Sequence, residues 1–80
     1  MNSPSFDHDL DLMGLKCPLP ALKTAKFLKS LTPGARLQVR CSDPMAVIDI
    51  PNLLNTTGDI LVSQSEDQGT LVFLIRKAGA

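Results

Sequence analysis

The chain has 80 residues, of which 44% are hydrophobic and 20% charged, and its formal net charge at pH 7 is zero. A chain of this length forms one domain that buries only about 60% of its unfolded surface, which excludes a deep, enclosed active site. The hydrophobic fraction is typical of a globular protein and excludes a disordered chain. No apolar run approaches the ~18 residues of a membrane helix, and the N-terminal stretch is acidic where a secretory signal is basic and then apolar.

These features predict a cytoplasmic protein with no membrane partner. We expect a single domain at residues 9–77, between short tails at 1–8 and 78–80. The charges are segregated: residues 13–40 hold six basic and no acidic side chains, and residues 43–67 hold five acidic and no basic ones. Such polarity favours approach to an acidic partner, although a lysine-rich solvated helix face gives the same pattern. With net charge zero and few aromatic residues, we expect no direct contact with nucleic acid.

Hydrophobic periodicity predicts six elements. In chain order they are a strand at 8–12, an amphipathic helix at 18–31, a strand at 36–41, a helical segment at 44–57, and a hairpin of strands at 60–65 and 70–77. Because Pro51 lacks a backbone donor, we expect the helical segment to be two pieces, broken or kinked near Ile50, with Asp49 capping the second. The order predicts an α/β (α+β) two-layer sandwich, β-α-β-α-β-β, with a mixed four-stranded sheet and two helices on one face.

The predicted topology also indicates where reactive residues meet. A right-handed crossover makes the first two strands parallel. Cys17 stands at the start of the first helix, Cys41 at the end of the second strand, and Asp43 two residues later. All three should lie at the carboxyl edge of the parallel strands, where ligands and catalytic groups gather in open sheets.

The segment Cys17-Pro18-Leu19-Pro20 is the most informative motif. If Pro18 is the first helical residue, Cys17 is the cap, where the helix dipole lowers the pKa of a thiol. Because the two prolines have no N–H, mainly the N–H of Leu19 remains to bond the sulfur. We therefore expect a rigidly placed, exposed and only moderately acidified thiol, suited to accepting sulfur and releasing it. The alternative is a structural cysteine, although cysteine is a poor helix cap.

A longer pattern surrounds this motif. Gly14-Leu15-Lys16 precede it, and the residues that follow at compatible spacing are Lys23, Pro33-Gly34, Asp43-Pro44, Asp49-Ile50-Pro51, Gly58 and Phe73-Leu74-Ile75-Arg76-Lys77. The pattern resembles the TusA/SirA-like sulfurtransferases over nearly the whole chain after about Asp9. The resemblance implies a persulfide on Cys17, with Gly14, Pro18 and Pro20 as its scaffold and Asp43 as a nearby conditioning or docking residue.

The resemblance also implies partners. Sulfur would come from a pyridoxal-phosphate-dependent cysteine desulfurase or a rhodanese-like donor. It would pass to a downstream relay protein, in tRNA wobble-uridine thiolation or another sulfur pathway. We expect a monomer that needs no metal or organic cofactor of its own. Where relatives of the tRNA-thiolation type place a basic residue before the Asp-Ile-Pro segment, this chain has Ile48, so no particular acceptor is assigned.

Other candidate residues have two interpretations each. Lys16 and Lys23 lie within about two turns of Cys17 and would favour its thiolate, or they are ordinary surface lysines. Cys41 is expected to pack inward as a small hydrophobic residue, and the alternative is a second thiol that forms a disulfide with Cys17. A zinc site made of the two cysteines and His8 would lack a fourth ligand, so we expect no metal.

Two other function classes remain open. A noncatalytic regulatory or protein-interaction module predicts that Cys17→Ser leaves partner binding intact. A thiol redox protein predicts a reversible disulfide between Cys17 and Cys41, but the Cys-x-x-Cys spacing is absent. A sulfur carrier predicts instead that Cys17→Ser abolishes sulfur transfer while Cys41→Ala spares it.

Overall fold

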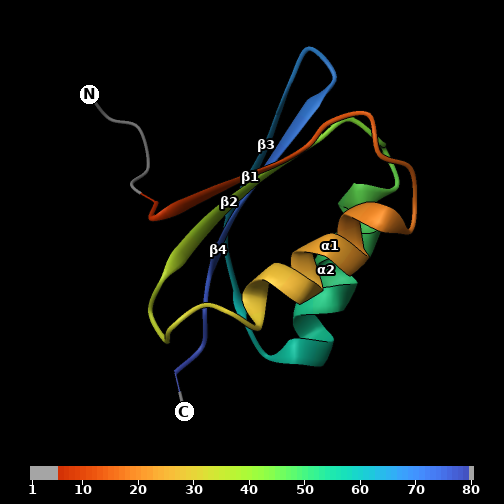
Figure 1. The fold of residues 1–80 in the computed structure, drawn as a ribbon. Coiled ribbons are helices and arrows are strands. Elements are labelled where there is room, and N and C mark those ends of the chain that lie inside the picture. The colour runs from red at the N-terminus through yellow and green to blue at the C-terminus, as the bar shows by residue number, and fades with distance from the viewer. Residues whose placement is uncertain (1–5, 80) are drawn as a thin grey trace.

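The computed structural model describes residues 6–79 and shows a four-stranded mixed sheet with both helices on one face (Figure 1). The elements in chain order are β1 (His8–Leu12), α1 (Leu19–Leu28), β2 (Arg36–Cys41), α2 (Ala46–Thr57), β3 (Ile60–Asp67) and β4 (Thr70–Arg76). The predicted two-layer α/β (α+β) architecture and its element order are confirmed. Residues 1–5 of the predicted N-terminal tail, and residue 80 of the predicted C-terminal tail, lie outside the described residues.

The sheet has the order β1-β2-β4-β3, so β1 is an edge strand. β1 pairs in parallel with β2, as the crossover rule predicts, and Leu12 lies opposite Cys41. β4 pairs antiparallel with both β2 and β3. Gln68 and Gly69 have positive φ values of 51° and 83°, as a two-residue hairpin turn requires. This tight turn lets β3 stay paired up to Asp67, beyond its predicted end.

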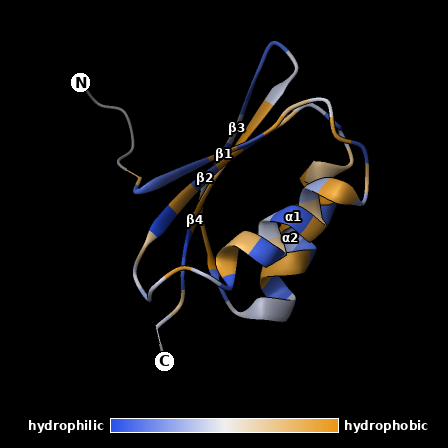
Figure 2. Ribbon diagram, viewed as in Figure 1, coloured by the Kyte–Doolittle hydropathy of each residue, from blue (hydrophilic) through white to orange (hydrophobic). Residues whose placement is uncertain are grey.

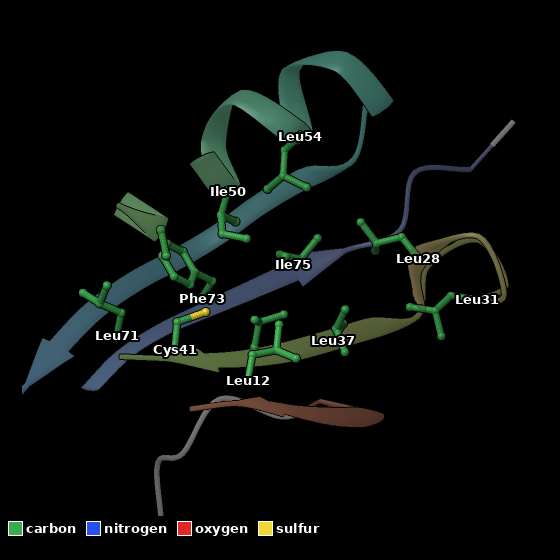
Figure 3. Packing of buried hydrophobic residues seen from close by; sticks show 12 residues of the cluster. Leu12, Leu28, Leu31, Leu37, Cys41, Ile50, Leu54, Leu71, Phe73 and Ile75 are labelled. Carbon is green, nitrogen blue, oxygen red and sulfur yellow. The ribbon is translucent and has the colours of Figure 1, made fainter. Parts of the chain in front are cut away.

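The core lies between the sheet and the two helices (Figure 3). Every second residue of β2 points inward, and Cys41, at the end of that strand, is 0% exposed. This confirms the expected inward packing of the Cys41 thiol. Figure 3 shows its sulfur on the same face of the sheet as Leu12 and Phe73. The fully buried large side chains include Leu28, Leu37, Val39, Ile50, Phe73 and Ile75.

The first helix is shorter than predicted at both ends. It begins at Leu19 and ends at Leu28, inside the predicted range of 18–31. Beyond that point the N–H groups of Ser30 and Leu31 bond three residues back, to the carbonyls of Phe27 and Leu28. The chain therefore tightens into a 3₁₀-like turn before the connection to β2.

The second helix runs without interruption through Pro51, so the predicted division into two pieces is wrong. Proline removes only one backbone donor from this helix. Ala46, Ile50 and Leu54 recur at four-residue steps and are all buried, so one apolar face holds both halves of the helix in place.

Both helices carry hydrophobic as well as hydrophilic residues (Figure 2), as expected for helices with one buried face. In the part of the chain that the structure describes, neither helix is long and apolar enough to cross a membrane.

Candidate functional site

Cys17 lies in the connection between β1 and α1, and its side chain is exposed. It does not cap the helix, contrary to the prediction: Pro18 occupies that position, and no side-chain hydrogen bond is made at the cap. The N–H of Leu19, the donor expected for the sulfur, bonds instead to the carbonyl of Lys16 at 2.8 Å. The Leu19 N–H is therefore used within the backbone turn, and no side-chain hydrogen bond joins Cys17 to the start of α1.

Two side chains between β2 and α2 hold the loop that carries Cys17. Ser42 Oγ accepts a hydrogen bond from the Gly14 N–H at 2.8 Å, and Asp43 Oδ2 accepts one from the Cys17 N–H at 2.5 Å. Asp43 Oδ1 also accepts from the N–H of Met45 at 3.1 Å. One carboxylate thus binds the Cys17 loop and the start of α2 together. Gly14 has φ 84°, a left-handed backbone conformation that favours glycine.

Two carboxylates influence the Cys17 thiol. The side chain of Asp49 is the largest cause that raises the pKa of Cys17 above its ordinary value, followed by desolvation and by the charge of Asp43. A nearby carboxylate stabilises S–H and repels the thiolate. The prediction of a moderately acidified thiol is therefore wrong in direction.

Asp43 itself is held in its charged form. The backbone N–H groups of Cys17 and Met45, in that order, hold the pKa of Asp43 below its ordinary value, and the charge of Lys16 adds to this effect. The carboxylate next to the reactive loop is thus a permanent anion at neutral pH. Such an anion is a stable acceptor for the Cys17 N–H.

Sequence reasoning does not find Asp49 or Ser42 as part of this site. Asp49 is predicted to cap a second helical piece, but α2 is continuous and Asp49 lies in its first turn. One sequence signal could have indicated that Asp49 belongs to the site. It is a carboxylate in the first turn of a helix that starts at the same sheet edge as Cys17. Ser42 directly follows the last residue of β2, and that position predicts contact with the neighbouring loop.

The two lysines near Cys17 in sequence lie in different surroundings. Lys16 is close enough to Asp43 to influence the pKa of that carboxyl. Lys23 lines a groove with Leu10 and Phe27, between α1 and β1. The structure therefore brings Lys16, Asp43 and Asp49 together around Cys17 and places Lys23 beside another surface.

Cys41 is chemically different from Cys17, although both are free thiols. Desolvation, followed by the charge of Asp43, raises the pKa of Cys41 to about 11. A buried, protonated thiol is inert as a nucleophile. Among residues 6–79 there is no group of three or more His, Cys, Asp or Glu side chains placed to hold a metal ion.

Replacing Asp49 with asparagine should make Cys17 more acidic. The amide keeps the size of the side chain but removes the negative charge that disfavours the thiolate. At neutral pH, below the raised pKa of Cys17, the rate of alkylation by iodoacetamide follows the thiolate fraction, so we expect it to rise by a factor of a few. At high pH, where Cys17 is ionised in both proteins, the two rates should converge.

The measurement is the pH profile of alkylation, read by mass on the peptide that contains Cys17. Asp67→Asn, an exposed change at the hairpin turn, is the matched control and should leave the profile unchanged. An Asp49→Asn profile that coincides with the wild-type profile would contradict the role given to this carboxylate.

Comparison of the sequence with known proteins finds a matching family and similar relatives. The family model for sulfurtransferase TusA matches residues 8–77. The chain is 40% identical over 73 residues to the sulfur carrier protein TusA of Allochromatium vinosum, covering 91% of this chain and 96% of that protein. It is 39% identical over 71 residues to the sulfur carrier protein TusA of Pseudomonas putida, covering 89% of each.

A solved structure supports the fold independently. The crystal structure of the SirA-like protein from Desulfitobacterium hafniense superposes with a TM-score of 0.79 at 19% identity, covering 90% of this chain and 99% of that one. The family match spans the whole of the sheet, both helices and the Cys-Pro-x-Pro segment. The chain therefore belongs to the TusA family of sulfurtransferases.

Proposed function

We propose that this protein carries sulfur as a persulfide on Cys17. Membership of the TusA family supports a sulfur-carrier role between a sulfur donor and a sulfur acceptor. The observation that supports Cys17 as the carrying residue is its exposure, because the other cysteine, Cys41, is 0% exposed. An exposed sulfur is accessible to the reactive groups of two successive proteins.

Loading follows the chemistry of thiol–disulfide exchange. Cys17 loses its proton, and its thiolate attacks the outer sulfur of a persulfide on the donor. The S–S bond of the donor breaks, and the donor leaves as a thiolate that takes up a proton. Cys17 then carries the transferred sulfur as a persulfide, and no external electrons are consumed.

Unloading repeats the same displacement with the roles exchanged. A thiolate of the acceptor attacks the outer sulfur on Cys17, the S–S bond of the carrier breaks, and Cys17 leaves as a thiolate that is reprotonated. The carboxylates that raise the pKa of Cys17 reduce its thiolate fraction and make it a slower leaving group. An isolated carrier would therefore exchange slowly with stray small thiols.

We infer that the donor is a cysteine desulfurase or a rhodanese-like protein and that the acceptor is a further relay protein in the cytoplasm. The pathway is tRNA thiolation or another sulfur relay. The choice stays open because this chain has Ile48 where relatives of the tRNA-thiolation type have a basic residue. A monomer suits this work, because the Cys17 loop must face each partner in turn. Asp43 and Lys16 would condition the loop, and Gly14, Pro18 and Pro20 would shape it.

Intact mass spectrometry tests this proposal. After incubation with a cysteine desulfurase and cysteine, the wild-type protein should gain one sulfur atom, about 32 Da, which a reductant removes. Peptide mapping should place the added mass on the peptide with Cys17. A sample without desulfurase is the control. No gain with several donors would favour the noncatalytic interaction module, and a gain on the Cys41 peptide would contradict the assignment to Cys17.

A further inference from the structure

A shallow groove between β1 and α1 is separate from the Cys17 loop. The residues that line it are Leu10, Lys23, Lys26, Phe27 and Ser30. Leu10 and Phe27 are half-buried, and they provide its apolar surface. The ring of His8 packs edge-on against Phe27, with 5.6 Å between the ring centroids. The groove thus combines an apolar floor with two lysines.

The groove has an uncompensated positive charge. Among the described residues, no carboxylate lies within salt-bridge distance of Lys23 or Lys26. The acids of β1 are engaged elsewhere: Asp9 and Asp11 lie 3.0 and 3.7 Å from the guanidinium of Arg40. Since alternate residues of a strand face opposite sides, these acids point away from the side on which Leu10 lies.

The position of the groove leaves the thiol accessible. Phe27 is eight residues after Leu19, the first residue of α1, which corresponds to about 12 Å along a helix. Because β1 is the edge strand, no further strand closes the outer side of the groove. An extended segment can therefore lie along the groove while Cys17 stays exposed.

We propose that this groove binds an acidic segment of a partner protein, with one large apolar side chain on Leu10 and Phe27 and carboxylates beside Lys23 and Lys26. The inference rests on the proposed function, because a carrier that delivers sulfur needs its partner held while the thiol reacts. Charge complementarity selects an acidic occupant, and the apolar floor selects a peptide side chain. Two lysines are too few for the phosphate contacts that dominate nucleic-acid binding.

A synthetic peptide, Glu-Asp-Leu-Phe-Glu-Asp, is a suitable probe, and its binding can be followed by NMR titration of the isotopically labelled protein. We expect saturable amide shifts centred on residues 8–10 and 23–30. The double variant Lys23→Glu/Lys26→Glu should weaken binding at least ten-fold. The matched control is Lys29→Glu, an exposed lysine of the same region that does not line the groove, and it should weaken binding less than two-fold.

Several outcomes would overturn the proposal. Equal weakening by Lys29→Glu would mean that the peptide responds only to net charge. Shifts centred on Cys17, no saturable shifts, tighter binding of a single-stranded RNA oligonucleotide, or self-association through the groove would each assign the surface differently. The mass experiment on Cys17 is independent of this test. A protein that binds the peptide but never gains sulfur would contradict the proposed sulfur-carrier function, but it would still support the groove as a binding site for an acidic peptide.

Discussion

Replacing Cys17 with serine should reduce sulfur transfer to the background of a reaction without carrier, whereas replacing Cys41 with alanine should preserve transfer. Serine offers a hydroxyl group, which is not ionised at neutral pH and cannot form a persulfide. Cys41 is buried and its pKa is raised to about 11, so its thiol is not available to a partner. The measurement is the transfer of radiolabelled sulfur from a cysteine desulfurase to an acceptor thiol.

Circular dichroism should show that both variants remain folded. Cys41→Ala removes a buried sulfur and is expected to cost about 1 kcal/mol of unfolding free energy, which the domain tolerates. Loss of transfer in both variants would favour the redox pair of Cys17 and Cys41. Retained transfer in Cys17→Ser would remove the basis for a persulfide at this position.

Replacing Phe73 with alanine should lower the free energy of unfolding by about 3–5 kcal/mol. Phe73 is 0% exposed and sits in β4 opposite Val39 of β2, at the centre of the sheet. The loss combines the transfer energy of the ring with the cavity that remains. Because the total stability of a folded protein is only about 5–15 kcal/mol, this single change should remove a large share of it. Urea unfolding followed by circular dichroism measures the effect.

Val62→Ala is the matched control for the core variant. Val62 is 42% exposed and lies at the irregular step in the pairing of β3 with β4. Its truncation should change the unfolding free energy by no more than about 0.5 kcal/mol. Similar urea midpoints for the two variants, with unchanged slopes, would contradict the position of the core between the sheet and the helices.

The strands could be predicted closely from sequence because each has a local pattern. β1 and β2 have the predicted bounds, since alternation along 8–12 and 36–41 directly reports a half-buried strand. The bounds of α1 and the continuity of α2 were predicted less well. The continuity of α2 depends on burial of Ile50 and Leu54 against the sheet, a tertiary effect that outweighs the local cost of Pro51.

The proximity of Asp43 to Cys17 was predicted from sequence, but the electrostatics of the thiol was not. Topology places Asp43 beside Cys17, and the structure joins them by a hydrogen bond. Local rules, however, consider only the helix that follows Cys17 and its dipole. The carboxylates that set the proton affinity of the thiol come from Asp43 and Asp49, far along the chain, and only the folded arrangement brings them to the sulfur.

The two hydrogen bonds of Asp43 have a mechanical consequence. One carboxylate group accepts from the N–H of Cys17 through one oxygen and from the N–H of Met45 through the other. A displacement of the start of α2 would therefore strain the hydrogen bond that holds the loop of Cys17. The loop that carries Cys17 and the start of α2 therefore share one anchor, so the loss of this carboxylate would free both at once.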